Sequence, residues 1–132
     1  DYGFTPLFPF GYGLSYTTFD YSDLVLSSDV MAMDGSLTVK AKVTNSGAYD
    51  ADEIVQFYVR DRVGSLTRPI KELKGYKRLR INRGETAEVE FSLTAEDLAF
   101  FDGKETITEP GNFDVWIGPN SDEGLHGEFI LK

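Results

Sequence analysis

Few side chains in this sequence could carry out catalysis. There is no cysteine, which excludes a thiol nucleophile and a thiolate metal site. His126 is the single histidine, so a metal site built on two histidines is excluded as well. Because His126 precedes Gly127 near the expected start of a strand, we interpret it as a surface residue rather than a catalytic base. The sequence contains no Gly-x-Ser-x-Gly motif and no phosphate-binding glycine loop.

Carboxylates are the remaining candidates, since a carboxylate pair can hydrolyse glycosides and converging oxygens can bind calcium. They gather in two stretches that we expect to be loops: Asp50, Asp52 and Glu53 in the first, and Glu96, Asp97, Asp102, Glu105 and Glu109 in the second. Their spacing does not fit an EF-hand loop, which favours solvated acidic loops over a calcium site. Catalytic pairs usually lie in a concave pocket, and a small domain with short loops offers little concavity. We expect no catalytic residue, no metal and no cofactor in this chain.

Charge and length narrow the class of protein. The chain has 132 residues, which suits one domain with its own core. Lys and Arg number 13 against 22 Asp and Glu, a net charge of −9 that argues against nucleic acid and anionic membranes as partners. The sequence starts with neither Met nor the basic and apolar regions of a signal peptide. We therefore expect a mature or excised fragment.

The first 18 residues differ in composition from the rest. Six aromatic side chains lie there, at positions 2, 4, 8, 10, 12 and 16, and prolines and glycines separate them. Proline removes a backbone donor and glycine disfavours both helix and strand, so we expect no regular element here. An arm this apolar should lie against a surface, either that of this chain or that of a neighbour.

Residues 19–132 form short runs in which apolar and polar side chains alternate, the pattern of half-buried strands. The expected strands cover residues 19–26, 37–44, 54–59, 70–81, 89–93, 113–117 and 127–131. We expect bulges near Ser22-Asp23 and at Gly75-Tyr76, a turn at residues 45–47, and a helical turn that begins after Thr94. About seven strands with turns between them predict an all-β, two-sheet antiparallel sandwich.

Two features suggest contacts rather than chemistry. Trp116, the only tryptophan, has the opposite parity to the apolar side chains of residues 113–117 and should point outward. An outward tryptophan can anchor a domain interface or stack on a sugar ring, while burial in a core is the alternative. Gln56, Tyr58 and Arg60 alternate on one face of a strand whose other face is also apolar, which again implies a neighbour.

Several segments resemble one known family. Residues 6–19, Pro-Leu-Phe-Pro-Phe-Gly-Tyr-Gly-Leu-Ser-Tyr-Thr-Thr-Phe, resemble the segment that joins the catalytic region of glycoside hydrolase family 3 to its C-terminal fibronectin type III-like domain. Residues 55–59 and 68–76 resemble that domain's Val-Gln-x-Tyr-Val strand and its Arg-Pro-x-Lys-x-Leu-Lys-Gly-aromatic signature. Residues 83–91 resemble its Pro-Gly-Glu turn and following strand, with Arg83 in place of proline, and residues 110–118 its penultimate strand.

The resemblance implies an immunoglobulin/fibronectin type III-like sandwich over residues 19–132, preceded by a linker arm, residues 1–18, from a catalytic region. It also implies a bacterial, periplasmic or extracellular parent enzyme, a retaining β-glucosidase or β-xylosidase whose catalytic residues lie in other domains. The chain alone would not be an enzyme. Its partners would be the catalytic domains of the same polypeptide, and oligosaccharide would be reached only through the parent.

We accordingly predict a non-catalytic accessory domain that packs on and stabilises the catalytic domains, with a loop possible near the substrate entrance. The predicted interface residues are Phe8, Pro9, Phe10, Tyr12, Leu14, Tyr16, Arg68, Pro69 and Trp116. The main alternative is a carbohydrate-binding module that uses Trp116 and nearby tyrosines as its aromatic platform. A free-standing adhesion domain and an intrinsic hydrolase are further alternatives.

Overall fold

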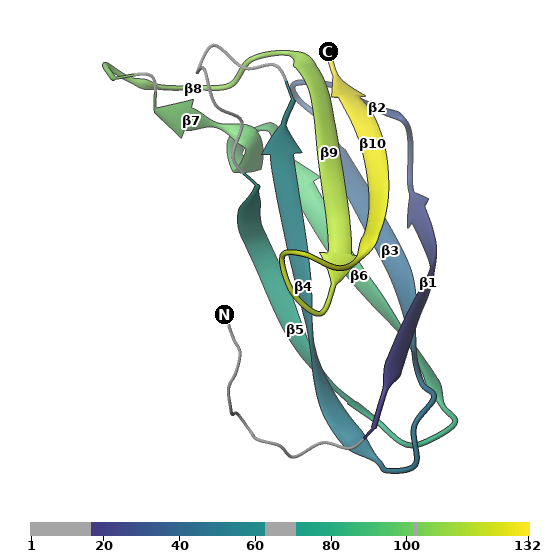
Figure 1. Cartoon of the computed structure of the whole chain (residues 1–132). Helices are drawn as coiled ribbons and strands as arrows, with labels where there is room; N and C mark the ends of the chain where they lie inside the picture. Colours follow the sequence, from purple (N-terminus) through teal and green to yellow (C-terminus); the bar gives the residue numbers. More distant parts are fainter. Residues whose placement is uncertain (1–16, 63–70, 102) are drawn as a thin grey trace.

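The computed structural model describes residues 17–62, 71–101 and 103–132 (Figure 1). Its strands are β1 (Phe19–Leu26), β2 (Val30–Met31), β3 (Ser36–Asn45), β4 (Ala51–Asp61), β5 (Glu72–Ile81), β6 (Thr86–Thr94), β7 (Phe100–Phe101), β8 (Thr106–Ile107), β9 (Gly111–Gly118) and β10 (Leu125–Leu131). One 3-10 helix, Ala95–Leu98, follows β6 where the sequence predicts a helical turn. In these described ranges no helix is long and apolar enough to cross a membrane.

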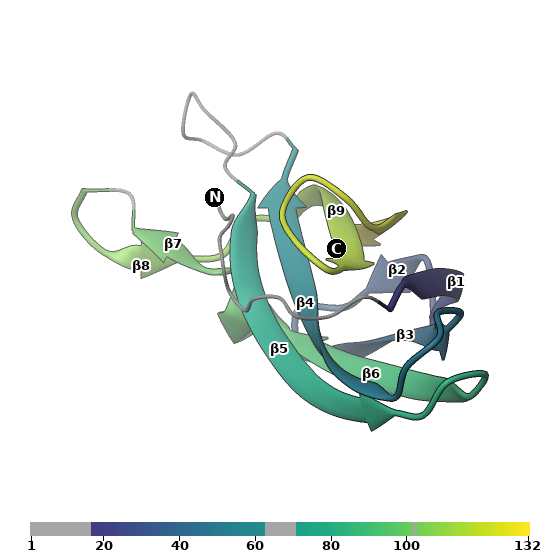
Figure 2. The ribbon, with the colours of Figure 1, turned by 60° about the horizontal axis from the view of Figure 1, so that its bottom comes forward.

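The strands form two facing sheets, which confirms the predicted sandwich. One has three strands in the order β1-β3-β6, and the other has five in the order β2-β10-β9-β4-β5. The described pairings are antiparallel, except that the two-residue β2 runs parallel to β10. Figures 1 and 2 show the two sheets as layers, with the β7–β8 hairpin projecting from one side.

The core is the set of inward positions that the alternation predicts. From β3, Leu37, Val39 and Val43 are fully buried, and Val55 and Ile117 are fully buried on the opposite sheet. Phe57 of β4 stacks on Phe91 of β6 across the sandwich, with ring centroids 4.9 Å apart. Phe113 and Phe129 stack within the five-stranded sheet at 5.3 Å. Apolar burial between the sheets therefore holds them face to face.

The two predicted bulges are present. In β1 the pairing with β3 shifts between Ser22 and Val25, and Asp23 adopts a positive φ of 55°. In β5 the shift falls one residue before the expected place, because Gly75 pairs with Phe57 while Leu73 pairs with Tyr58. The extra residue reverses the parity of β5. Alternation along the expected strand 70–81 predicts that Leu73 shares a face with Leu79 and Ile81, and that prediction is wrong: Leu73 is exposed, whereas Ile81 is buried.

A buried asparagine, Asn45, forms hydrogen bonds at the end of the sandwich that contains Thr17, the first described residue. The side-chain Oδ1 of Asn45 accepts hydrogen bonds from Thr17 Oγ1 at 2.6 Å and from the Gly47 amide at 3.0 Å. Its Nδ2 donates to the carbonyls of Tyr49 and Ile81, at 2.7 and 2.9 Å. These bonds satisfy the amide fully and build the predicted turn at residues 45–47. Residues 1–16 lie outside the described residues, so the proposed arm stays a prediction.

Candidate functional site

The two outer faces of the sandwich differ in chemistry. On the three-stranded sheet, outward positions other than Val25 carry hydroxyl and charged side chains, such as the Thr44–Thr86 hydrogen bond and the Lys40–Glu90 ion pair. Such a face is suited to water. The five-stranded sheet carries ion pairs on its outer face too, but it also exposes large apolar side chains there: Ile54, Leu73 and Tyr76 on β4 and β5, and Val30 and Ile130 on β2 and β10. An apolar group gathered on one face is typical of an interaction surface.

Trp116 lies within this outer face, on β9, as its parity predicts. Cross-strand pairing places it between Tyr58 of β4 and His126 of β10. Trp116 is half-buried and does not belong to the core between the sheets, so the alternative of core burial is wrong. The outward orientation is therefore confirmed, while the interface role of the residue stays a prediction.

Two cations lie over the Trp116 ring. The Nζ of Lys71 is 4.1 Å from the ring centroid, and the guanidinium carbon of Arg60 is 5.1 Å from it. Both distances are in the range of cation–π attraction. The His126 ring is tilted against the same indole, with centroids 5.1 Å apart. This crowding leaves the indole poorly suited to serve as a flat sugar platform.

Beside Trp116, the buried carboxylate of Asp114 is the centre of an ion-pair network. Its side chain is 2 % exposed and accepts hydrogen bonds from Arg60 Nη2 at 2.9 Å, Arg62 Nη2 at 2.6 Å and His126 Nε2 at 2.9 Å. Arg62 also pairs with Glu128 at 2.9 Å. Burial alone would raise the pKa of Asp114, but hydrogen bonds from Arg62, His126 and Arg60 hold that pKa well below its ordinary value.

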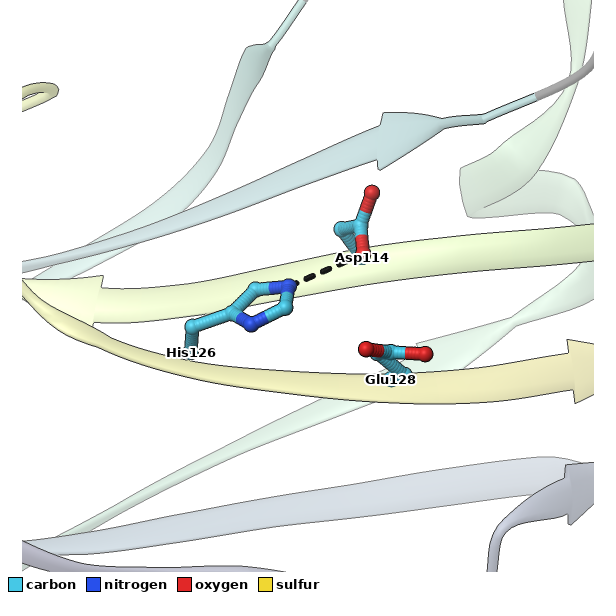
Figure 3. A group of neighbouring side chains, drawn as sticks. All are labelled: Asp114, His126 and Glu128. Carbon is cyan, nitrogen blue, oxygen red and sulfur yellow. Dashed lines mark hydrogen bonds and ion pairs between the residues drawn. The ribbon is translucent and has the colours of Figure 1, made fainter.

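Asp114, His126 and Glu128 are close enough to suggest a metal site (Figure 3), since their ligand atoms all lie within 4.8 Å of one another. The surrounding cations argue against that assignment. Both oxygens of Asp114 already accept from arginines, and Glu128 is paired with Arg62. Two guanidinium groups would repel a metal ion at this position. We assign the cluster to ion pairing.

The first acidic stretch does not converge on a site. Asp52 faces outward and pairs with Arg78 at 2.7 Å and Arg80 at 3.5 Å. Asp50 accepts from the Arg83 amide at 2.8 Å. Glu53 lies on the same, inward side of β4 as the buried Val55 and accepts a hydrogen bond from Tyr21 at 2.9 Å.

The second acidic stretch is described only in part. Asp97 accepts from the backbone amide of Thr94 at 2.8 Å, which caps the 3-10 helix. Asp102 lies outside the described residues.

Sequence reasoning located Trp116 but missed the charges that surround it. Arg62 lies outside the expected strand 54–59, Lys71 precedes the observed β5, and only the register places Arg60 opposite Asp114. Asp114 itself was the sequence signal for this network. It is a charged residue between two apolar neighbours, and it has the same parity as Trp116. The other predicted interface residues, Phe8, Pro9, Phe10, Tyr12, Leu14, Tyr16, Arg68 and Pro69, lie outside the described residues.

Comparison with known proteins identifies relatives of the whole fold. Residues 53–121 match the family described as the fibronectin type III-like domain. Beta-glucosidase BoGH3A of Bacteroides ovatus is 45 % identical over 120 residues, which cover 89 % of this chain and 16 % of that protein. A protein named periplasmic beta-glucosidase, from Salmonella typhimurium, is 42 % identical over 127 residues, covering 96 % of this chain and 17 % of its own length.

Solved structures of β-glucosidases contain a part with the same fold as this chain. A β-glucosidase from Erythrobacter marinus superposes with a TM-score of 0.85 and 35 % identity, covering 97 % of this chain and 17 % of that one. Beta-glucosidase 3B from Thermotoga neapolitana, solved in complex with glucose, gives 0.79 and 38 %, with 96 % and 17 % covered. The chain thus spans about a sixth of the length of these relatives.

Proposed function

The chain belongs to the fibronectin type III-like domain family, in the form that β-glucosidases contain as a small part of their length, and we propose that it is a non-catalytic accessory domain of such an enzyme. The parent would be a retaining family 3 glycoside hydrolase that acts on β-glucosides or β-xylosides, in the periplasm or outside the cell. The domain packs on the catalytic domains of its own polypeptide and stabilises them.

The asymmetry of the two outer faces carries this proposal. The side chains of Tyr76, Leu73 and Ile54 are 67, 51 and 48 % exposed, and they lie together on β4 and β5. Fully burying a leucine or isoleucine side chain is worth about 1.5–3 kcal/mol, so covering the exposed half of Leu73 is worth roughly 1 kcal/mol. A neighbouring domain seated on this face would gain several such contributions.

The proposal extends to residues outside the described ranges. The aromatic arm, with Phe8, Phe10 and Tyr12, would lie along the catalytic domains as the linker to them. The Arg68-Pro69 segment, which precedes β5 in the sequence, would contribute to the contact with the catalytic domains. A loop of this region could approach the substrate entrance of the parent. Carbohydrate binding by this domain itself is less well supported, because Lys71 and Arg60 lie over the Trp116 ring.

A matched pair of substitutions tests the proposal in the longer polypeptide. Leu73→Ser removes an apolar side chain that is 51 % exposed on the five-stranded sheet, and Val25→Ser removes one that is 56 % exposed on the three-stranded sheet. We expect Leu73→Ser to lower the temperature at which the enzyme loses aryl β-glucoside hydrolysis, and Val25→Ser to leave it unchanged. Equal effects of the two substitutions would contradict the proposed packing face.

A further inference from the structure

The cations over Trp116 are not equally neutralised. Arg60 donates two hydrogen bonds to Asp114, at 2.9 and 3.3 Å. Lys71 donates to the backbone carbonyl of Ser121 and lies over the rings of Trp116 and Tyr58, at 4.1 and 5.7 Å. In the described part of the chain no carboxylate lies within ion-pair distance of Lys71.

The two carboxylates of the network next to Lys71 are already paired with arginines. Asp114 is shared between Arg60 and Arg62, and Glu128 pairs with Arg62. Burial lowers the pKa of Lys71, and the charge of Arg60 lowers it further, while the charge of Asp122 partly opposes both. In a chain whose net charge is −9, Lys71 is thus a cation on the proposed packing face that no carboxylate of the described residues contacts within 4.0 Å.

Aromatic and apolar side chains adjoin this charge. Tyr58 pairs across the strands with the exposed Leu73 on one side and with Trp116 on the other. A partner group at this position would lose water on docking, and a charge-assisted hydrogen bond is stronger where water is excluded. The arrangement suits an acidic side chain whose surroundings are apolar, and it is unsuited to a basic one.

We propose that Lys71, together with Arg60, receives a carboxylate side chain, Asp or Glu, of the catalytic body of the same polypeptide, and that Trp116 supplies the apolar contact beside it. The inference rests on the proposed function and adds the chemistry of the partner. Asp114 is then a positioning residue, because the two hydrogen bonds that it accepts from Arg60 hold that side chain beside the indole, while Lys71 pairs across the interface.

The isolated chain allows a direct test, because Trp116 is its only tryptophan. Iodide and caesium quench indole fluorescence by contact, so their relative efficiency reports the local charge. Relative to neutral free N-acetyltryptophanamide, we expect the ratio of iodide to caesium quenching at Trp116 to be raised at least about twofold at low salt, against the negative charge of the whole chain. Lys71→Gln should abolish that preference, and the matched control Lys42→Gln, on the other sheet, should retain it. An iodide to caesium ratio in the unmodified chain no higher than that of N-acetyltryptophanamide would overturn the inference.

A second measurement addresses the partner itself. In the longer polypeptide, Lys71→Gln should shorten the half-life of heat inactivation at least about tenfold, since removal of one member of a desolvated charge pair is costly. The same substitution should leave unfolding of the isolated chain nearly unchanged. If Leu73→Ser destabilises the longer polypeptide while Lys71→Gln does not, the packing face stands and the carboxylate partner is refuted. If neither does, both proposals fail.

Discussion

Replacement of Asp114 by asparagine should destabilise the isolated chain substantially. The change keeps the shape of a side chain that is 2 % exposed, but removes the charge that pairs with Arg60 and Arg62. Breaking a fully buried ion pair costs about 3–5 kcal/mol. Here the two arginine side chains are 39 and 36 % exposed and can regain water, so we expect about 2 kcal/mol. For a chain of this length, that lowers the melting temperature by roughly 6–8 °C.

The pH dependence gives this prediction a sharper form. Because the folded-state pKa of Asp114 is depressed, its contribution to the free energy of unfolding is present above the ordinary aspartate value of 3.8 and is lost as the pH falls below it. Asp114→Asn should therefore reduce stability most near neutral pH and least at pH 3. Urea unfolding followed by Trp116 fluorescence between pH 3 and 7 measures both effects.

Asp52→Asn is the matched control for Asp114→Asn. Asp52 also pairs with two arginines on the same face and its pKa is also lowered, but its side chain is far more exposed. We expect a smaller loss of stability, because water screens an exposed pair. If Asp114→Asn changed the free energy of unfolding no more than Asp52→Asn does, Asp114 would not be the centre of the network.

Two further predictions concern other parts of the chain. Burial raises the pKa of Glu53, although hydrogen bonds from Tyr21 and the Ile54 amide oppose that shift. The folded state therefore favours the protonated acid, and its free energy of unfolding decreases as the pH rises through the raised pKa. Glu53→Gln should therefore stabilise the isolated chain in urea unfolding at pH 7 and have no such effect at pH 4; destabilisation at both would refute this account. In affinity electrophoresis the isolated chain should migrate at the same rate with and without β-glucan or xylan, and retardation would favour a carbohydrate-binding module instead.

Much of the fold can be predicted from the sequence, because its signals are local. Alternation along residues 37–44 defines which side chains of β3 enter the core, and the glycine at position 75 marks a bulge to within one residue. The opposite parity of Trp116 indicates that it leaves the core. Each of these inferences needs only a few consecutive residues, since the side-chain period of a strand is two.

Only the tertiary structure decides what the outward side chains meet. Arg60 and Asp114 are separated by 54 positions in the sequence, and the register between β4 and β9 brings them together. The bulge in β5 reverses the direction of Leu73 and adds it to the exposed face beside Tyr58. Alternation is a property of one strand, whereas register is a property of two, so the sequence determined the sandwich and its inward face while cross-strand pairing assembled the charged and apolar surface around Trp116.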